Sequence, residues 1–212
     1  MKKNKKDKPS WISIIAGGFM AIGLIAGLIY FFSIWMGNKY ALPVLGDPGH
    51  RAGAFSFVNQ DGKSVTEQSV KNKVTVATYF FTSCPSICPV MNANLRQVYE
   101  KFKAQSDFVI LSHTVDPARD SIPVLKAYAR RLDADTPEWQ FLTGDKMALY
   151  TSASRDYLLS AADSGTGQFV HTQYVALLDK SRQIRGFYDM TRKESIGKLE
   201  TDIQQLLLAD SN

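Results

Sequence analysis

The feature that most constrains this chain is a long uncharged stretch near its N-terminus. Residues 10–38 include no charged side chain. About 20 apolar residues are enough to cross a bilayer, so we expect a transmembrane helix over residues 11–36, with some tilt. The tail before it, residues 1–10, holds five lysines and one aspartate. The positive-inside rule keeps such a tail in the cytoplasm and puts the rest of the chain across the membrane.

A cleaved signal peptide is the competing interpretation of this segment. The apolar core of a signal peptide is usually about 7 to 15 residues long and ends at a small-x-small site. No such site follows Met36. We therefore expect a retained single-pass anchor in the inner (cytoplasmic) membrane, with the C-terminal domain in the periplasm or extracytoplasmic space. Gly23 and Gly27 have the spacing seen in helix dimers, which leaves a homodimer open.

The net charge does not indicate a nucleic-acid-binding protein. The formal charge is +5, and the tail alone contributes four of these positive charges. The remainder has no basic stripe with interleaved aromatic residues, so we expect no nucleic-acid partner. Residues 37–53 are rich in proline and glycine and are predicted to be a linker. Residues 54–212 have the length of one domain with its own core.

Within that domain, strand and helix patterns alternate. Residues 54–58 and 64–66 flank an Asp-Gly turn and predict a hairpin. The other expected elements are buried strands at 74–81 and 108–111, helices over 89–102, 121–133 and 145–157, a second hairpin of 174–178 with 184–188, and a C-terminal helix around 196–206. This order predicts an α/β sandwich whose central strands are parallel. The end of the first long strand is then a natural place for a site.

The only two cysteines of the chain occupy that place. Cys84 and Cys88 are one helical turn apart, between the strand at 74–81 and the following helix. Two thiolates at this spacing can converge on one soft ion, and two sulfurs favour Cu(I) or Zn(II). A third ligand of imidazole type would complete a trigonal copper site or fill three of the four positions of a tetrahedral zinc site. A small structural disulfide is the simpler alternative, although such a bridge closes only a short loop and therefore stabilises little.

Three histidines are available as the third ligand. His171 lies in a polar loop just before the strand at 174–178, and loops at strand ends display functional side chains in this kind of fold. We therefore favour His171 over a simple surface histidine in that position. His113 follows a predicted strand and fits a packed or hydrogen-bonded histidine better. His50 lies in the linker, where we expect it to be solvated.

A charged turn follows the second strand at the same edge of the predicted sheet. Asp116 and Arg119 belong to it and could act beside a metal ion or in docking. The alternative is structural, because Arg119 could simply pair with Asp116 or Asp120 and stabilise the loop. Met91 fits the core better than a copper site.

Four segments resemble the Sco/SenC family of copper proteins: residues 79–89, 114–120, 125–128 and 141–144. They occur in order within a match that runs from about residue 42 to 208, and the single membrane anchor before it is a further shared feature. The resemblance implies a thioredoxin-like fold with a central mixed sheet. It also implies delivery of copper to the binuclear copper site of cytochrome c oxidase subunit II, or reduction of the cysteines in that site.

The resemblance further implies residue roles. The copper ligands, for Cu(I) or Cu(II), map onto Cys84, Cys88 and His171, and Asp116 matches an acidic residue near the metal. Family members often have Asp-His-Ser around the histidine, whereas this chain has Val170-His171-Thr172. The ligand is retained, but an aspartate next to it is not.

Two functional hypotheses are favoured over the others. The first is a membrane-anchored copper metallochaperone, a binding protein that needs a thiol reductase as a second partner. The second is a thiol-disulfide oxidoreductase. Such enzymes generally use a Cys-x-x-Cys motif and a cis-proline. This chain instead has three residues between its cysteines, and it has no proline between Ser164 and Tyr174. A peroxiredoxin-like peroxidase and a zinc site are less favoured alternatives.

Overall fold

The computed structural model describes residues 11–39, 42–159, 162–163, 169–170 and 173–209. It divides the chain into two compact units, residues 1–41 and residues 42–212. The described part of the first unit is helix α1 (Trp11–Lys39). Among the described residues, no helix combines the length and the apolar character that crossing a membrane requires.

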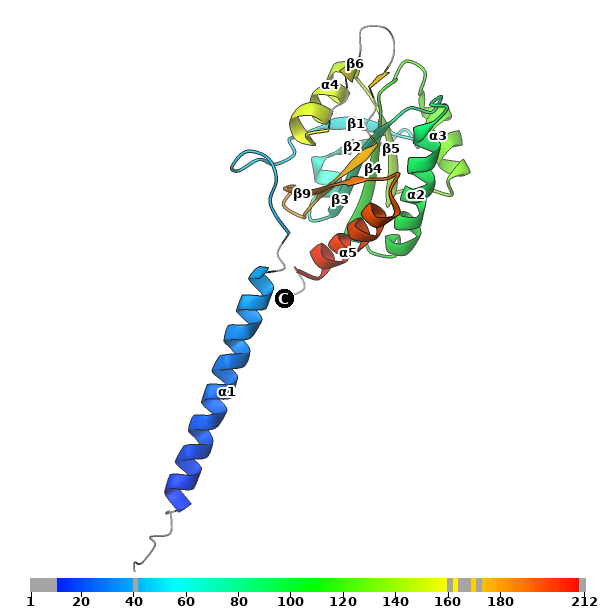
Figure 1. Cartoon of the computed structure of the whole chain (residues 1–212). Coiled ribbons are helices and arrows are strands. Elements are labelled where there is room, and N and C mark those ends of the chain that lie inside the picture. Colours follow the sequence, from blue (N-terminus) through cyan, green and yellow to red (C-terminus); the bar gives the residue numbers. More distant parts are fainter. Residues whose placement is uncertain (1–10, 40–41, 160–161, 164–168, 171–172, 210–212) are drawn as a thin grey trace, which may run out of the picture. The chain divides into compact units, whose positions relative to one another are not determined.

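The second unit is built on one mixed sheet (Figure 1). Its seven strands lie in the order β2-β1-β5-β4-β3-β8-β9, and β3, β4 and β5 are parallel while the other pairs are antiparallel. A separate two-stranded sheet pairs β6 with β7. The strands are β1 (Ser56–Asn59), β2 (Ser64–Thr66), β3 (Val74–Phe80), β4 (Phe108–Thr114), β5 (Trp139–Thr143), β6 (Ala162–Asp163), β7 (Phe169–Val170), β8 (Tyr174–Leu178) and β9 (Ile184–Asp189).

Helices connect these strands much as the sequence predicts. They are α2 (Ile87–Phe102), α3 (Ile122–Arg131), α4 (Lys146–Thr151) and α5 (Lys193–Ala209), with a 3-10 turn at Glu67–Val70 and a π-helical turn at Ser152–Asp156. Asp145 caps α4 by accepting a hydrogen bond from the backbone N–H of Ala148 at 2.8 Å. The helix expected over 145–157 therefore begins where predicted, but changes to π geometry in its second half.

One central strand was absent from the sequence prediction. β5 pairs in parallel with β4 and antiparallel with β1, so it joins the N-terminal hairpin to the rest of the sheet. Trp139 and Phe141 of this strand belong to the core that also holds the two cysteines. The strand is only five residues long and includes Gln140, so its pattern alone does not distinguish it from a buried loop.

Both faces of the sheet are covered, which explains why the central strands read as continuous apolar runs. Along β3, Val74, Val76 and Phe80 point to one face, where α2, α3 and α5 pack. Ala77 and Tyr79 point to the other face, where the π-helical turn packs. The two cysteines belong to the first of these cores.

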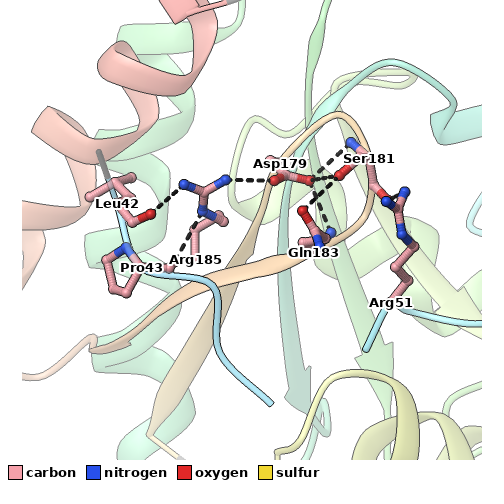
Figure 2. Close-up of polar contacts among 7 residues, drawn as sticks. All are labelled: Leu42, Pro43, Arg51, Asp179, Ser181, Gln183 and Arg185. Atoms are coloured by element: carbon pink, nitrogen blue, oxygen red, sulfur yellow. Dashed lines mark hydrogen bonds and ion pairs between the residues drawn. The ribbon is translucent and has the colours of Figure 1, made fainter. Parts of the chain in front are cut away.

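The segment predicted as a linker is bound to the domain from Leu42 onward (Figure 2). The guanidinium of Arg185 donates hydrogen bonds to the backbone carbonyls of Leu42 and Pro43 and to the carboxylate of Asp179. Further hydrogen bonds follow along the segment. The backbone N–H of Leu45 donates to Ile184 O at 2.8 Å and that of Ala52 to Arg182 O at 3.0 Å, while the Arg51 side chain donates from Nη1 to Ser181 O at 3.1 Å. The β8–β9 hairpin thus holds residues 42–53 along much of their length.

Candidate metal centre

The cysteine pair lies where strand β3 gives way to helix α2. Strand β3 ends at Phe80, a loop covers residues 81–86, and α2 begins at Ile87. Cys84 therefore lies in the loop and Cys88 in the first turn of the helix. We call residues 81–86 the cysteine loop. Placing both sulfurs at the C-terminal edge of a parallel strand fulfils the expectation from the sequence.

Both cysteines are thiols that lie close together below the surface. Neither forms a disulfide, and their exposed fractions are 6% for Cys84 and 0% for Cys88. The backbone N–H of Cys88 donates to Cys84 Sγ across 3.4 Å. That bond directs the Cys84 sulfur at the N-terminus of α2, where the partial positive charge of the helix stabilises a thiolate.

The two thiols differ in acidity. Burial tends to raise the pKa of Cys84, but hydrogen bonds from the Cys88 thiol and from the backbone N–H groups of Ser86, Cys88 and Ile87 outweigh it and lower the pKa. Burial raises the pKa of Cys88 to about 12, and its hydrogen bond to Cys84 adds to this effect. Cys84 is therefore the thiol that ionises first.

Two adjacent sulfurs can do one of two things. They can bind a soft ion as thiolates, or they can exchange between dithiol and disulfide. Within the described parts of the chain, no group of three His, Cys, Asp or Glu side chains is placed to hold a metal ion. The described site is thus a two-sulfur site, and the donor set suits copper or zinc.

Of the three histidines, His171 lies outside the described residues. His113 is fully buried in β4, stacked on Tyr79 with ring centroids 4.8 Å apart, and its Nδ1 lies 3.3 Å from the carbonyl oxygen of Thr78. This is the packed, hydrogen-bonded histidine that we favoured at that position. His50 is half-buried rather than solvated, because its Nε2 lies 3.1 Å from the carbonyl oxygen of Asp156.

Asp116 and Arg119 lie in the loop after β4, at the same edge of the sheet as the cysteine loop. Asp116 is 6% exposed, and its Oδ2 is 3.7 Å from Nη1 of the exposed Arg119. The structural alternative, in which Arg119 pairs with Asp116, is therefore observed. No hydrogen bond to Asp116 Oδ2 is present among the described residues. Met91 is 2% exposed and belongs to the core, as expected.

Sequence reasoning missed the carboxylate that contacts the cysteine loop. Asp120 is 1% exposed and accepts hydrogen bonds from the backbone N–H and the hydroxyl of Thr82 and from the hydroxyl of Thr114. From the sequence, Asp120 was only a possible partner of Arg119. A signal was available in the sequence, because Thr114 ends β4 and Thr82 follows the end of β3. Two hydroxyls at the same edge of a sheet need a hydrogen-bond acceptor, and Asp120 is a nearby carboxylate.

Comparison with known proteins decides the family. The family model described as SCO1/SenC matches residues 45–208. The chain belongs to the SCO1/SenC family. Its mixed sheet with flanking helices is the thioredoxin-like fold of Sco structures, as the resemblance implied.

Three relatives illustrate the match. The SCO1 protein homolog of Bacillus subtilis is 39% identical over 124 residues, which are 58% of this chain and 62% of that protein. This chain therefore spans less than two thirds of that relative's length. BsSco, a Sco family member with an identified disulfide switch, has a TM-score of 0.68 at 27% identity, covering 79% of this chain and 97% of that one. Copper-bound ScoI of Arabidopsis thaliana has a TM-score of 0.60 at 27% identity, covering 73% and 98%.

Proposed function

We propose that this chain is a membrane-anchored copper metallochaperone that assists assembly of the binuclear copper site of cytochrome c oxidase. The observation that carries the proposal is the pair of adjacent, reduced thiols at the strand-to-helix turn. Membership of a family with copper-bound structures supports copper as the cargo. BsSco is described as belonging to a family of cytochrome c oxidase assembly proteins, which supports that oxidase as the client. The choice of its subunit II comes from the resemblance of the sequence to the family.

In this proposal copper is cargo, held by Cys84, Cys88 and His171. Cys84 supplies the more acidic thiol and Cys88 must lose its proton when the ion enters, so loading releases protons and depends on pH. Both sulfurs must be reduced beforehand, which requires a thiol reductase in an oxidising compartment. Asp116 and Arg119 act beside the site rather than as ligands.

Metal analysis of the purified full-length protein in mild detergent tests the copper site. We expect one copper per chain in the wild type, loss in Cys84→Ser and Cys88→Ser, and weaker binding in His171→Ala. His50→Ala is the matched control, since its ring contacts the backbone carbonyl of Asp156, in the π-helical turn that packs on the other face of the sheet from the cysteines. Undiminished copper in Cys84→Ser would overturn the proposed site, and bound zinc in place of copper would identify the alternative cargo.

We also propose that residues 11–36 form a single-pass anchor, with residues 1–10 in the cytoplasm and residues 54–212 on the far side of the inner membrane. The support is the uncharged sequence from residue 10 to 38 next to a lysine-rich tail. Alkaline carbonate washing of membranes should leave the full chain in the pellet and release a chain that lacks residues 1–41. Release of the full chain would refute the anchor.

Thiol-disulfide exchange is the second candidate function. It is favoured by the Cys84 sulfur, which is stabilised at the helix N-terminus and has the lower pKa. The Cys84 thiolate would attack a client disulfide, and Cys88 would then displace the client as a dithiol while the protein becomes the disulfide. Reduction of the cysteines of a subunit II fragment by the metal-free dithiol form tests this step. A Cys88→Ser protein should stop at the mixed disulfide.

A further inference from the structure

We propose that Asp120 is the positioning residue of this centre: it holds the cysteine loop against the loop that carries Asp116 and so sets the spacing of the two sulfurs. The proposal deepens the proposed function and depends on it only for the copper measurement. Its basis is the set of contacts that the Asp120 carboxylate makes across 38 residues of sequence.

The carboxylate connects the ends of two neighbouring strands. β3 and β4 are parallel, with Phe80 opposite Thr114, so both strands end at the same edge of the sheet. Asp120 Oδ2 lies 3.2 Å from the backbone nitrogen of Thr82, two residues before Cys84, and both hydroxyls, of Thr82 and Thr114, donate to the same carboxylate. The cysteine loop is therefore hydrogen-bonded to the exit of β4.

The same contacts hold Asp116 in place. The Thr114 hydroxyl oxygen accepts a hydrogen bond from the Asp116 backbone N–H at 2.9 Å. The Asp116 carbonyl in turn accepts from the N–H of Arg119 and of Asp120. This turn brings the Asp120 side chain back over the cysteine loop. One carboxylate thus restrains both loops at the centre.

The hydrogen bonds at this position use both oxygens of the Asp120 side chain as acceptors. An asparagine amide would keep one acceptor oxygen and would replace the other with an NH2 group that faces a present donor. No cation pairs with Asp120 in the described part of the chain, so its hydrogen bonds are what compensates its burial. Loosening them releases the loop that carries Cys84.

The competing explanation is that Asp120 only stabilises the fold. Asp202 provides the matched control, because it is also a buried carboxylate, 5% exposed, that accepts hydrogen bonds from the Tyr188 hydroxyl and from Lys198. Asp202 lies on α5, and its hydrogen-bond partners Tyr188 and Lys198 belong to β9 and α5 rather than to either loop of the centre. Asp202→Asn should therefore lower stability without changing the relation between the sulfurs.

The experiment measures the equilibrium between the dithiol and the Cys84–Cys88 disulfide in the metal-free full-length protein. In this reaction oxidised glutathione takes the two electrons, so one protein disulfide and two glutathione thiols form. The variants are Asp120→Asn, Thr82→Val, Thr82→Ser and Asp202→Asn. Thr82→Ser keeps the hydroxyl that donates to Asp120, whereas Thr82→Val removes it. Thr82→Val also tests the proposal if the Asp120→Asn protein does not fold. Copper affinity by chelator competition and urea unfolding complete the set.

We expect the copper affinity of Asp120→Asn and Thr82→Val to fall by about tenfold, the low end of the loss seen when residues that orient metal ligands are removed. The disulfide equilibrium constant should fall by a similar factor, because the same loop sets the spacing of the sulfurs. Thr82→Ser and Asp202→Asn should stay near the wild type. Unchanged constants in Thr82→Val, or an equal fall in Asp202→Asn, would overturn the positioning role. If the wild type bound no copper, the proposed function would fail, but the disulfide equilibrium would still test Asp120.

Discussion

The contact between Arg185 and residues 42–43 predicts a specific loss of stability in Arg185→Ala. The guanidinium donates to the carbonyl of Leu42, to that of Pro43 at 3.0 Å and to the Asp179 carboxylate at 2.9 Å. The Arg185 and Asp179 side chains are only 17% and 13% exposed. This places the pair between a surface ion pair, which contributes about 0–1 kcal/mol, and a buried pair, whose disruption costs about 3–5 kcal/mol.

We expect Arg185→Ala to lower the free energy of unfolding by about 2–3 kcal/mol. Asp179 keeps the N–H groups of Ser181 and Gln183 as donors, so its charge is not left without partners, and the cost stays below that of a fully buried pair. For a domain of this size, about 2–4 °C of melting temperature correspond to each kcal/mol. The melting temperature should therefore fall by about 4–12 °C.

Urea denaturation of the fragment 42–212, which forms a compact unit, measures this loss. Arg96→Ala is the control, because Arg96 pairs with Asp133 at 43% and 66% exposure and should cost less than about 1 kcal/mol. In a fragment that begins at Ala54, the two carbonyl partners of Arg185 are already gone, and the same substitution should cost clearly less. An equal cost in both fragments, or a cost no larger than that of Arg96→Ala, would refute this account of the segment.

Three further predictions concern acidity and packing. Burial lowers the pKa of His113 to about 4 from 6.5, so as the pH falls from about 6.5 to 4 the unfolded chain takes up a proton that the folded chain does not. Stability should fall over that range by up to about 3 kcal/mol, and His113→Leu should lose this slope in urea titrations at several pH values. Iodoacetamide at pH 8 should modify Cys84 well before Cys88, because the pKa of Cys88 is raised to about 12 while that of Cys84 is lowered; equal rates in peptide mass spectra would contradict this order. Gly186→Ala should cost about 1–3 kcal/mol, because a Cβ there would lie 2.6 Å from Cζ of Tyr188 and displace that ring; an unchanged melting temperature would show that Tyr188 moves freely.

The sequence predicted much of the architecture because local patterns carry it. Both hairpins, the buried strand before the cysteines and the helices after it follow from periodicity, turns and caps. β5 was not predicted because its identity as a strand depends on its partners β1 and β4, which are distant in sequence. The attachment of residues 42–53 to the β8–β9 hairpin was not predicted for the same reason. Proline and glycine indicate an irregular backbone, but they do not indicate which segment packs against it.

For the site, the sequence alone determined the residue types and their spacing: two cysteines one helical turn apart, after a strand and before a helix, which predict a soft-ion or redox pair. Only the tertiary structure decided which groups surround them. It gave the two thiols unequal acidity, buried His113 away from solvent, and made Asp120, from the sequence only a possible partner of Arg119, an acceptor for Thr82 and Thr114. Burial and hydrogen bonding depend on contacts between segments that are distant in sequence, whereas the residue types and their spacing are already present in the chain.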